Sequence, residues 1–97
     1  MRLIVSQRVL EKLKNKHKVR VSEAEECFLN QEKTFLEDTR VDHRTHPPTM
    51  WFIAPTDSQR LLKVVFIERS KKVYELKTAY DPNKEEERIY DKYATPL

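Results

Sequence analysis

Apolar residues recur with two different periods along the chain, first at helical spacing and then in the short runs typical of strands. An apolar run over 2–5 predicts a first strand. Apolar positions at helical spacing predict a helix over 7–17, with Ser6 as its N-terminal cap. The segment 22–25, Ser-Glu-Ala-Glu, has the pattern of a capping box and predicts a second helix that ends near Asn30. The N-terminal third is therefore predicted to form a strand and two helices.

The rest of the chain carries the strand pattern and one further helix. Four apolar runs of strand length occur at 34–36, 50–54, 61–67 and 73–79. The polar stretch 38–48 ends in two prolines and predicts a loop. The last two runs are close enough together to form a hairpin. Asn83 followed by Glu86 predicts the start of a terminal helix.

This order of elements predicts an α+β fold in one domain, 1–97. We expect a small antiparallel sheet of three to five strands, packed against two N-terminal helices and one C-terminal helix. One sheet face then lies under helices, and the other is open. Alternation within the run 73–79 places Tyr74, Leu76 and Thr78 on the same face.

Composition excludes several classes of protein. The chain of 97 residues contains no glycine, which excludes Gly-rich phosphate-binding loops; the first helix must then end at Lys18 either through a costlier backbone geometry or by fraying. Cys27 is the one cysteine, so an internal disulfide and a Cys-rich zinc site are excluded. No apolar run has membrane-spanning length, and we expect a cytoplasmic protein without membrane contact. The net charge of +3 permits nucleic acid or an acidic partner.

The first predicted helix is strongly basic. Arg8, Lys12 and Lys16 recur every four residues, and His17 follows them. Clustered cations are what phosphate binding needs, so these residues, together with Arg44 and Arg60, are candidates for RNA binding. The alternatives are a solvated helix face and, for His17, a half-buried structural histidine.

The predicted loop 38–48 contains a group of polar side chains that could bind a metal ion: Asp38, Asp42, His43 and His46. Spacing in a loop imposes little geometry, and no recognised zinc pattern is completed, so we predict neither a metal nor a cofactor. His43 and Arg44 are instead candidates for contacts to a phosphate.

The hairpin gathers a third set of candidates, for RNA cleavage without a metal. Such cleavage needs a base for the 2′-hydroxyl proton, a cation for the phosphorane and an acid for the 5′-oxygen. The candidates are Glu68 or His43 as the base, Arg69, Arg60 or Arg88 as the cation, and Tyr80 or His17 as the acid. The alternative is a surface ion-pair network among Glu68, Arg69 and Arg88.

Several of these segments resemble the BrnT-like toxins of bacterial toxin–antitoxin systems. The matching landmarks are Lys-His-Lys-Val at 16–19, Glu-Ala-Glu-Glu-Cys-Phe at 23–28, Asp-His at 42–43, Arg-Leu-Leu-Lys-Val-Val-Phe-Ile-Glu-Arg at 60–69 and Glu-Arg-Ile-Tyr at 87–90. The family typically has Lys-His-Gly-Val at the first landmark and Ser-Ala-Arg where this chain has Thr78, Ala79 and Tyr80. The segment 78–83 is similar to a divergent branch of short proteins.

The resemblance implies a RelE-like fold and a ribonuclease toxin that cleaves RNA without a metal and is neutralised by an antitoxin protein. RNA and an antitoxin are then the expected partners, and a homodimer is a further option. The alternative is a non-catalytic module on the same scaffold that binds RNA or protein. A hydrolase acting on a nucleotide-derived modification through His43 and Asp42 is a third hypothesis.

Overall fold

A mixed five-stranded sheet forms the middle of the molecule in the computed structural model, which describes residues 1–40 and 45–97. In spatial order its strands are β1 (Arg2–Ile4), β5 (Val73–Tyr80), β4 (Leu61–Ser70), β3 (Thr49–Pro55) and β2 (Leu36–Glu37). The four strands from β5 to β2 are antiparallel neighbours, whereas β1 runs parallel to β5, with Leu3 opposite Tyr74.

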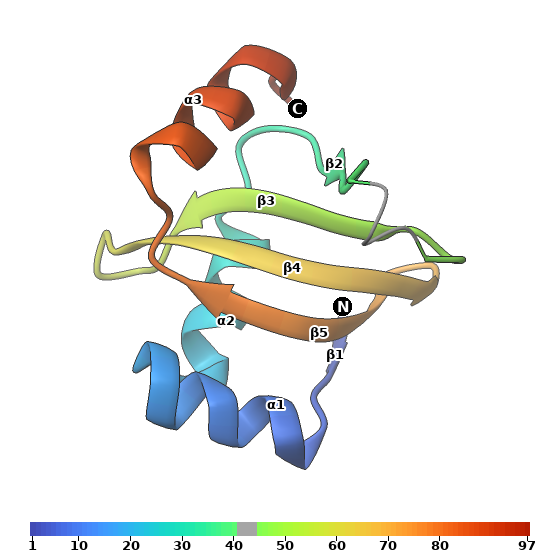
Figure 1. The fold of residues 1–97 in the computed structure, drawn as a ribbon, viewed down its shortest axis with the longest axis vertical. Coiled ribbons are helices and arrows are strands. Elements are labelled where there is room, and N and C mark those ends of the chain that lie inside the picture. The colour runs from blue at the N-terminus through green and yellow to red at the C-terminus, as the bar shows by residue number, and fades with distance from the viewer. Residues whose placement is uncertain (41–44) are drawn as a thin grey trace.

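The prediction of an antiparallel sheet is therefore wrong at the β1 edge. Strand β1 does not pair with β2, the next strand in the chain. It lies beside β5, the last strand in the chain (Figure 1). A three-residue apolar run carries no information on direction, because direction is set by the path of the whole chain. The coarser prediction, an α+β fold with two N-terminal helices and one C-terminal helix, is confirmed.

The first helix is continuous from α1 (Gln7–Lys12) into a π-helical end, η1 (Leu13–His17). Its predicted cap is confirmed, since the Val9 amide donates to Ser6 Oγ at 3.2 Å. Lys18 leaves the helix in the left-handed region, with φ of 55°. The expected costly exit is thus present, on a residue that has a Cβ.

The second helix, α2 (Val21–Leu29), begins before the position that Ser22 would give it. Arg20 is the N-cap residue, and its amide donates to Glu23 Oε1 at 3.0 Å. The prediction of Ser22 as the cap is wrong because a glutamate also stands three residues after Arg20. The last helix, α3 (Lys84–Tyr93), starts as predicted, with Asn83 Oδ1 accepting from the Glu86 amide at 2.8 Å.

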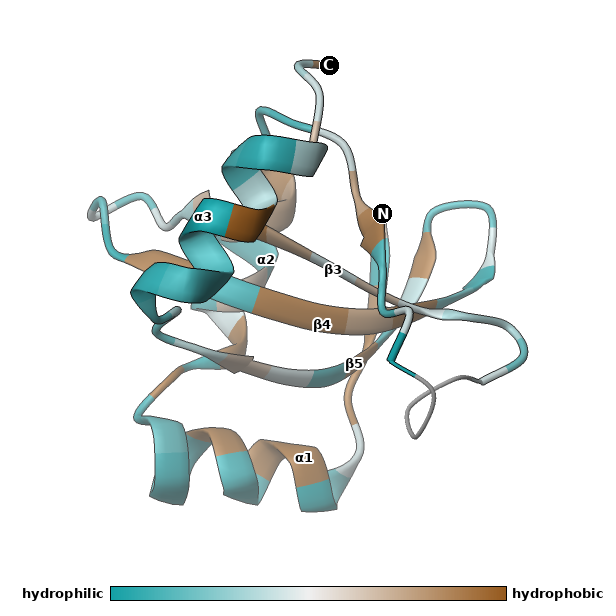
Figure 2. Cartoon of the chain, turned by 45° about the horizontal axis from the view of Figure 1, so that its top comes forward, coloured by the Kyte–Doolittle hydropathy of each residue, from teal (hydrophilic) through white to brown (hydrophobic). Residues whose placement is uncertain are grey.

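The helices lie on both faces of the sheet, so the prediction of one covered and one open face is wrong, although the two faces are covered unequally. Neighbouring residues of a strand point to opposite faces of the sheet. On one face the ring centre of Phe52 lies 4.9 Å from that of Phe28 in α2. On the other face the ring centre of Trp51 lies 5.7 Å from that of Tyr90 in α3. The aromatic core is on the α2 side, and apolar colour follows the middle strands in Figure 2. Helix α3 covers only part of the other face, near β3 (Figure 1).

A β-bulge changes which residues of β5 face the core. Val65 is opposite Thr78, but its neighbour Phe66 is opposite Leu76, so Lys77 is the extra residue. Ala79 is consequently buried with the core, and Thr78 lies on the other face. Among the described residues, no helix has the length and apolar character needed to cross a bilayer.

Candidate functional site

The predicted catalytic residues lie at two separate ends of strand β5. Glu68 is opposite Tyr74, six residues along the strand from Tyr80. At about 3.3 Å per residue this separation is roughly 20 Å. Arg69 lies at the Glu68 end, where its guanidinium is paired with Glu75 at 2.6 Å. The structure therefore does not bring Glu68 and Arg69 together with Tyr80.

Of the remaining predicted catalytic residues, the structure describes only Arg88, which joins neither end. Arg88 is exposed on α3 and is paired with Glu85 of the same helix. His43 and Arg44 lie outside the described residues, as does Asp42. In the part of the chain that is described, no three or more His, Cys, Asp or Glu side chains are grouped so as to hold a metal ion.

Arg60, predicted as an RNA contact, is engaged within the fold. Its guanidinium forms a two-pronged ion pair with Asp81, at 2.8 and 3.1 Å. It also donates to the carbonyl oxygens of Lys18 at 2.9 Å and His17 at 3.3 Å, and it contacts Glu23 at 3.4 Å. Arg60 thus caps the end of the first helix and fixes the backbone of His17.

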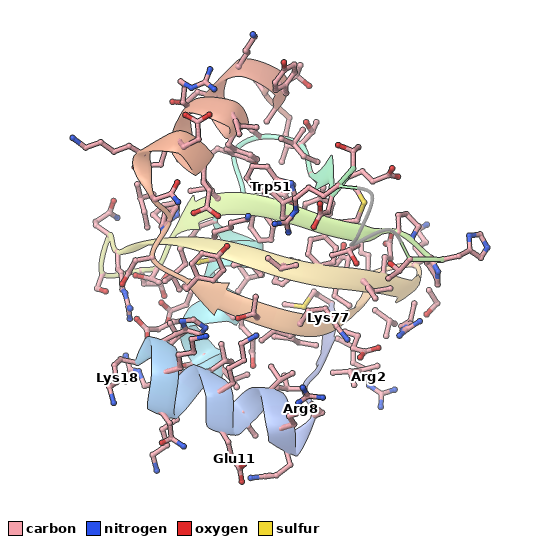
Figure 3. All side chains as sticks on the ribbon, viewed as in Figure 1. Arg2, Arg8, Glu11, Lys18, Trp51 and Lys77 are labelled. Atoms are coloured by element: carbon pink, nitrogen blue, oxygen red, sulfur yellow. The ribbon has the colours of Figure 1, made fainter. Side chains whose placement is uncertain are left out.

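The basic face of the first helix is free of ion pairs. Arg8, Lys12 and Lys16 are exposed, and none of them is paired with a carboxylate in the described ranges. Figure 3 marks the span of this helix with Arg8 near its start and Lys18 just past its end. These cations are available to an anionic ligand.

A chain of side-chain contacts begins at the end of this helix and crosses the sheet face on which α3 lies. The His17 and Tyr80 rings lie 5.4 Å apart, and the Tyr80 hydroxyl donates to Glu86 Oε2 at 2.8 Å. Lys63 Nζ is paired with the same oxygen at 2.8 Å and lies 4.5 Å from the centre of the Trp51 ring. We call His17, Tyr80, Glu86 and Lys63 the Tyr80 cluster.

The environment of His17 favours its neutral form. Its pKa is lowered by burial and then by the positive charges of Lys12 and Lys16, against a smaller opposing effect of Asp81. A neutral imidazole at neutral pH can accept a proton. His17 is therefore chemically suited to act as a base.

Tyr80 and Glu86 are held in opposite protonation states. Burial, followed by the hydrogen bond to Glu86, raises the pKa of the Tyr80 hydroxyl, which keeps its proton. Burial alone would raise the pKa of Glu86, but hydrogen bonds from Lys63, the Asn83 amide and Tyr80 together lower it. The pair is a protonated phenol beside a carboxylate.

A groove of about 600 Å³ continues from the Tyr80 cluster, between α3 and residues 36–40. Its apolar lining comes from Leu36, Trp51, Ile89 and Tyr93. Its charged lining comes from Glu37, Asp38, Arg40, Lys63 and Glu86. Trp51, labelled in Figure 3, marks its floor on β3. The Arg40 guanidinium is held to Asp38 by two hydrogen bonds of 3.0 and 2.8 Å.

Three of these residues, Lys63, Trp51 and Glu86, are missing from the site predicted from sequence. The one signal was Lys63 itself, a lysine inside the most apolar run of the chain. A lysine with 8% exposure in such a strand needs a partner for its charge. The partner, Glu86, could be found only with α3 in place.

No protein-family model matches the chain, and no curated protein is similar enough to match it. The chemistry of the site is defined by its own geometry: a neutral imidazole beside a protonated phenol, at the end of a helix that carries unpaired cations. Such a set is suited to binding a phosphodiester and moving its protons.

Proposed function

We propose that this protein is a metal-independent ribonuclease toxin with a RelE-like, BrnT-like fold, neutralised by an antitoxin protein. The observation that carries the proposal is the contact between the His17 and Tyr80 rings at the end of a helix whose cations are unpaired. The order of helices and strands is compatible with the sequence resemblance. The site we propose is the Tyr80 cluster, in place of the Glu68 and Arg69 end of the hairpin.

The three chemical roles are assigned within this end of the sheet. His17 removes the 2′-hydroxyl proton, because its pKa is lowered and its imidazole is neutral. Lys16, exposed and next to His17 in the chain, stabilises the charge on the phosphorane. Tyr80 is the proton donor to the leaving 5′-oxygen, and Glu86 holds its hydroxyl in position.

The basic face of the first helix would bind the RNA backbone. Arg8, Lys12 and Lys16 follow one another at intervals of four residues, which is about 6 Å along the helix axis at about 1.5 Å per residue. A single strand lying along this face would have its phosphates beside successive cations and would reach His17 at the end of the helix. Arg60 has a positioning role here, because it holds the His17 carbonyl.

Cleavage of a defined RNA by the purified protein tests the proposal. We expect cleavage to persist in EDTA and to fall by about 100-fold or more in His17→Ala and Tyr80→Phe, the usual scale for loss of acid–base catalysis. Tyr93→Phe is the matched control for loss of a tyrosine hydroxyl, because Tyr93 is 60% exposed at the end of α3. Arg69→Ala is expected to retain cleavage.

The variants also separate the two candidate sites. If Arg69→Ala abolishes cleavage and Tyr80→Phe does not, the active site lies at the hairpin and the Tyr80 cluster is structural. Arrest of growth on expression, relieved by the same substitutions that stop cleavage, would link the activity to toxicity.

One observation favours the alternative of a non-catalytic RNA-binding module. The Tyr80 hydroxyl is already committed to Glu86, and Lys63 neutralises that carboxylate, so the cluster is internally satisfied. Under this alternative the folded protein binds RNA with a steep salt dependence and leaves it intact. The cleavage assay above, with binding measured in parallel, distinguishes the two.

A further inference from the structure

We propose that the groove between α3 and residues 36–40 binds a peptide segment of a partner protein, one that carries apolar side chains flanked by lysine or arginine. This inference goes beyond RNA cleavage, because it concerns a different ligand and needs no proton transfer. It rests on the apolar lining of the groove and on the sign of the charge at its rim.

The apolar lining is the first observation. Tyr93, Ile89 and Leu36 line the same groove as Trp51. Tyr93 is 60% exposed, and Ile89 and Leu36 are half-buried, so apolar surface in the groove is accessible to a ligand. Covering such side chains stabilises a complex by about 25 cal/mol for each Å² of apolar surface removed from water. A ligand with apolar side chains therefore gains more here than a phosphodiester would.

The charge of the rim is the second observation. Two of the lining carboxylates are neutralised within the groove, Asp38 by Arg40 and Glu86 by Lys63. Glu37 is exposed, and no ion pair joins it to a residue whose position is described. Among the lining residues that the structure describes, three carboxylates and two cations sum to −1.

The first helix has the opposite charge. Over residues 7–17 it holds four lysines and arginines against one glutamate, a net charge of +3. An RNA backbone is attracted to that helix and repelled by Glu37, whereas a basic peptide is attracted to the groove. The charge distribution therefore assigns the groove to a peptide and the helix to RNA.

Selection of a displayed library of random peptides against the purified protein tests this inference without using RNA. We expect the selected peptides to combine apolar residues with lysine or arginine. Their synthetic versions should bind about tenfold more weakly to Tyr93→Glu, which puts a charge on the apolar wall, and to Glu37→Lys, which reverses the rim charge. Both positions are exposed or at the surface, and circular dichroism checks that the variants fold.

Two control variants define the result. Glu25→Lys, the same charge reversal at an exposed position of α2, should bind the peptides as the parent does. His17→Ala should also leave their affinity unchanged, so that loss of cleavage and loss of peptide binding are distinguishable. The inference is overturned if no peptide is selected, if the selected peptides are acidic, or if Tyr93→Glu binds them with parental affinity. It is also overturned if Tyr93→Glu loses affinity for single-stranded RNA, because the groove would then bind RNA.

Discussion

The guanidinium of Arg60, at the start of β4, pairs through Nε and Nη2 with both carboxylate oxygens of Asp81, just after β5. The same guanidinium donates to the Lys18 and His17 carbonyls, so one side chain joins the exit of the first helix to the connection before α3. In many helices a glycine in the left-handed region ends the last turn. This chain has no glycine, and Arg60 supplies hydrogen bonds to the helix end.

Replacing Lys18 with glycine should stabilise the protein. Lys18 has φ of 55°, where a residue with a Cβ is unfavourable by about 1–2 kcal/mol, partly offset by the greater flexibility of glycine in the unfolded chain. We expect Lys18→Gly to raise the free energy of unfolding in urea by about 1 kcal/mol. The control is Lys14→Gly in the same helix, which should lower it by about the same amount. A decrease in Lys18→Gly would contradict this account of the helix exit.

The Arg60–Asp81 pair should make stability depend on pH. The hydrogen bond from Arg60 holds the pKa of Asp81 below its ordinary value. A carboxyl group whose pKa is lower in the folded state stabilises it above the unfolded pKa of about 4, and this stabilisation is lost as the pH falls through the folded pKa. Asp81→Asn should therefore be less stable than the parent at pH 7, with a difference that shrinks in acid.

Urea unfolding of both proteins from neutral to acid pH measures that difference. Glu25→Gln, at an exposed position of α2, is the control for loss of one negative charge. If the free energies of unfolding of Asp81→Asn and the parent differ by the same amount down to acid pH, the charge of Asp81 is not what stabilises the protein.

The buried pair of Lys63 and Glu86 predicts an asymmetric response to mutation. Their side chains are 10% and 18% exposed and are 2.8 Å apart. Glu86→Ala leaves the Lys63 ammonium unpaired and should lower the free energy of unfolding by about 2–4 kcal/mol. Adding Lys63→Met to Glu86→Ala should recover most of this loss, because the second change removes the unpaired charge. If both variants are equally unstable, the loss comes from the hydrogen bond that the Asn83 amide donates to Glu86 Oε1 and not from the charge.

The thiol of Cys27 should be unreactive in the folded protein. Cys27 is fully buried, and its Sγ donates to the Ala54 carbonyl at 3.4 Å. Burial raises the pKa of the thiol to about 12, so almost no thiolate is present at neutral pH. An aromatic disulfide reagent should label the unfolded chain rapidly and the native chain only at the rate of unfolding. Rapid labelling of the native protein would show that α2 opens locally.

The sequence was sufficient for most of the elements, although the cap of α2 was wrong and β2 is Leu36–Glu37 instead of 34–36, but it was not sufficient for the way they meet. The cap at Ser6, the start of α3 at Asn83 and the strand over 61–67 follow from local patterns, which the structure confirms. The parallel edge at β1 and the bulge at Lys77 depend on pairing between distant segments, which local periodicity does not contain.

The predicted site had the same limit. His17 and Tyr80 were predicted from sequence as alternatives for the acid; the structure brings their rings together, and we now propose His17 as the base. Glu68 and Tyr80 were placed in one site because a hairpin joins their strands, yet the length of β5 separates them. Lys63 and Glu86 meet through the packing of α3 on the sheet, which no spacing in the sequence indicates.

RNA binding should lose its salt dependence as cations of the first helix are removed. For a single strand, the slope of log K against log salt is about −0.7 for each phosphate neutralised. Lys12→Ala and Lys16→Ala are each expected to reduce the magnitude of this slope by about 0.7, and the double variant by about 1.4. Fluorescence anisotropy with a labelled single-stranded RNA, at several salt concentrations, gives these slopes. Lys84→Ala, which removes an exposed lysine at the start of α3, is the control and should leave the slope unchanged. If Lys84→Ala reduces the magnitude of the slope as much as Lys12→Ala does, the RNA lies along α3. The basic face of the first helix is then only a solvated surface.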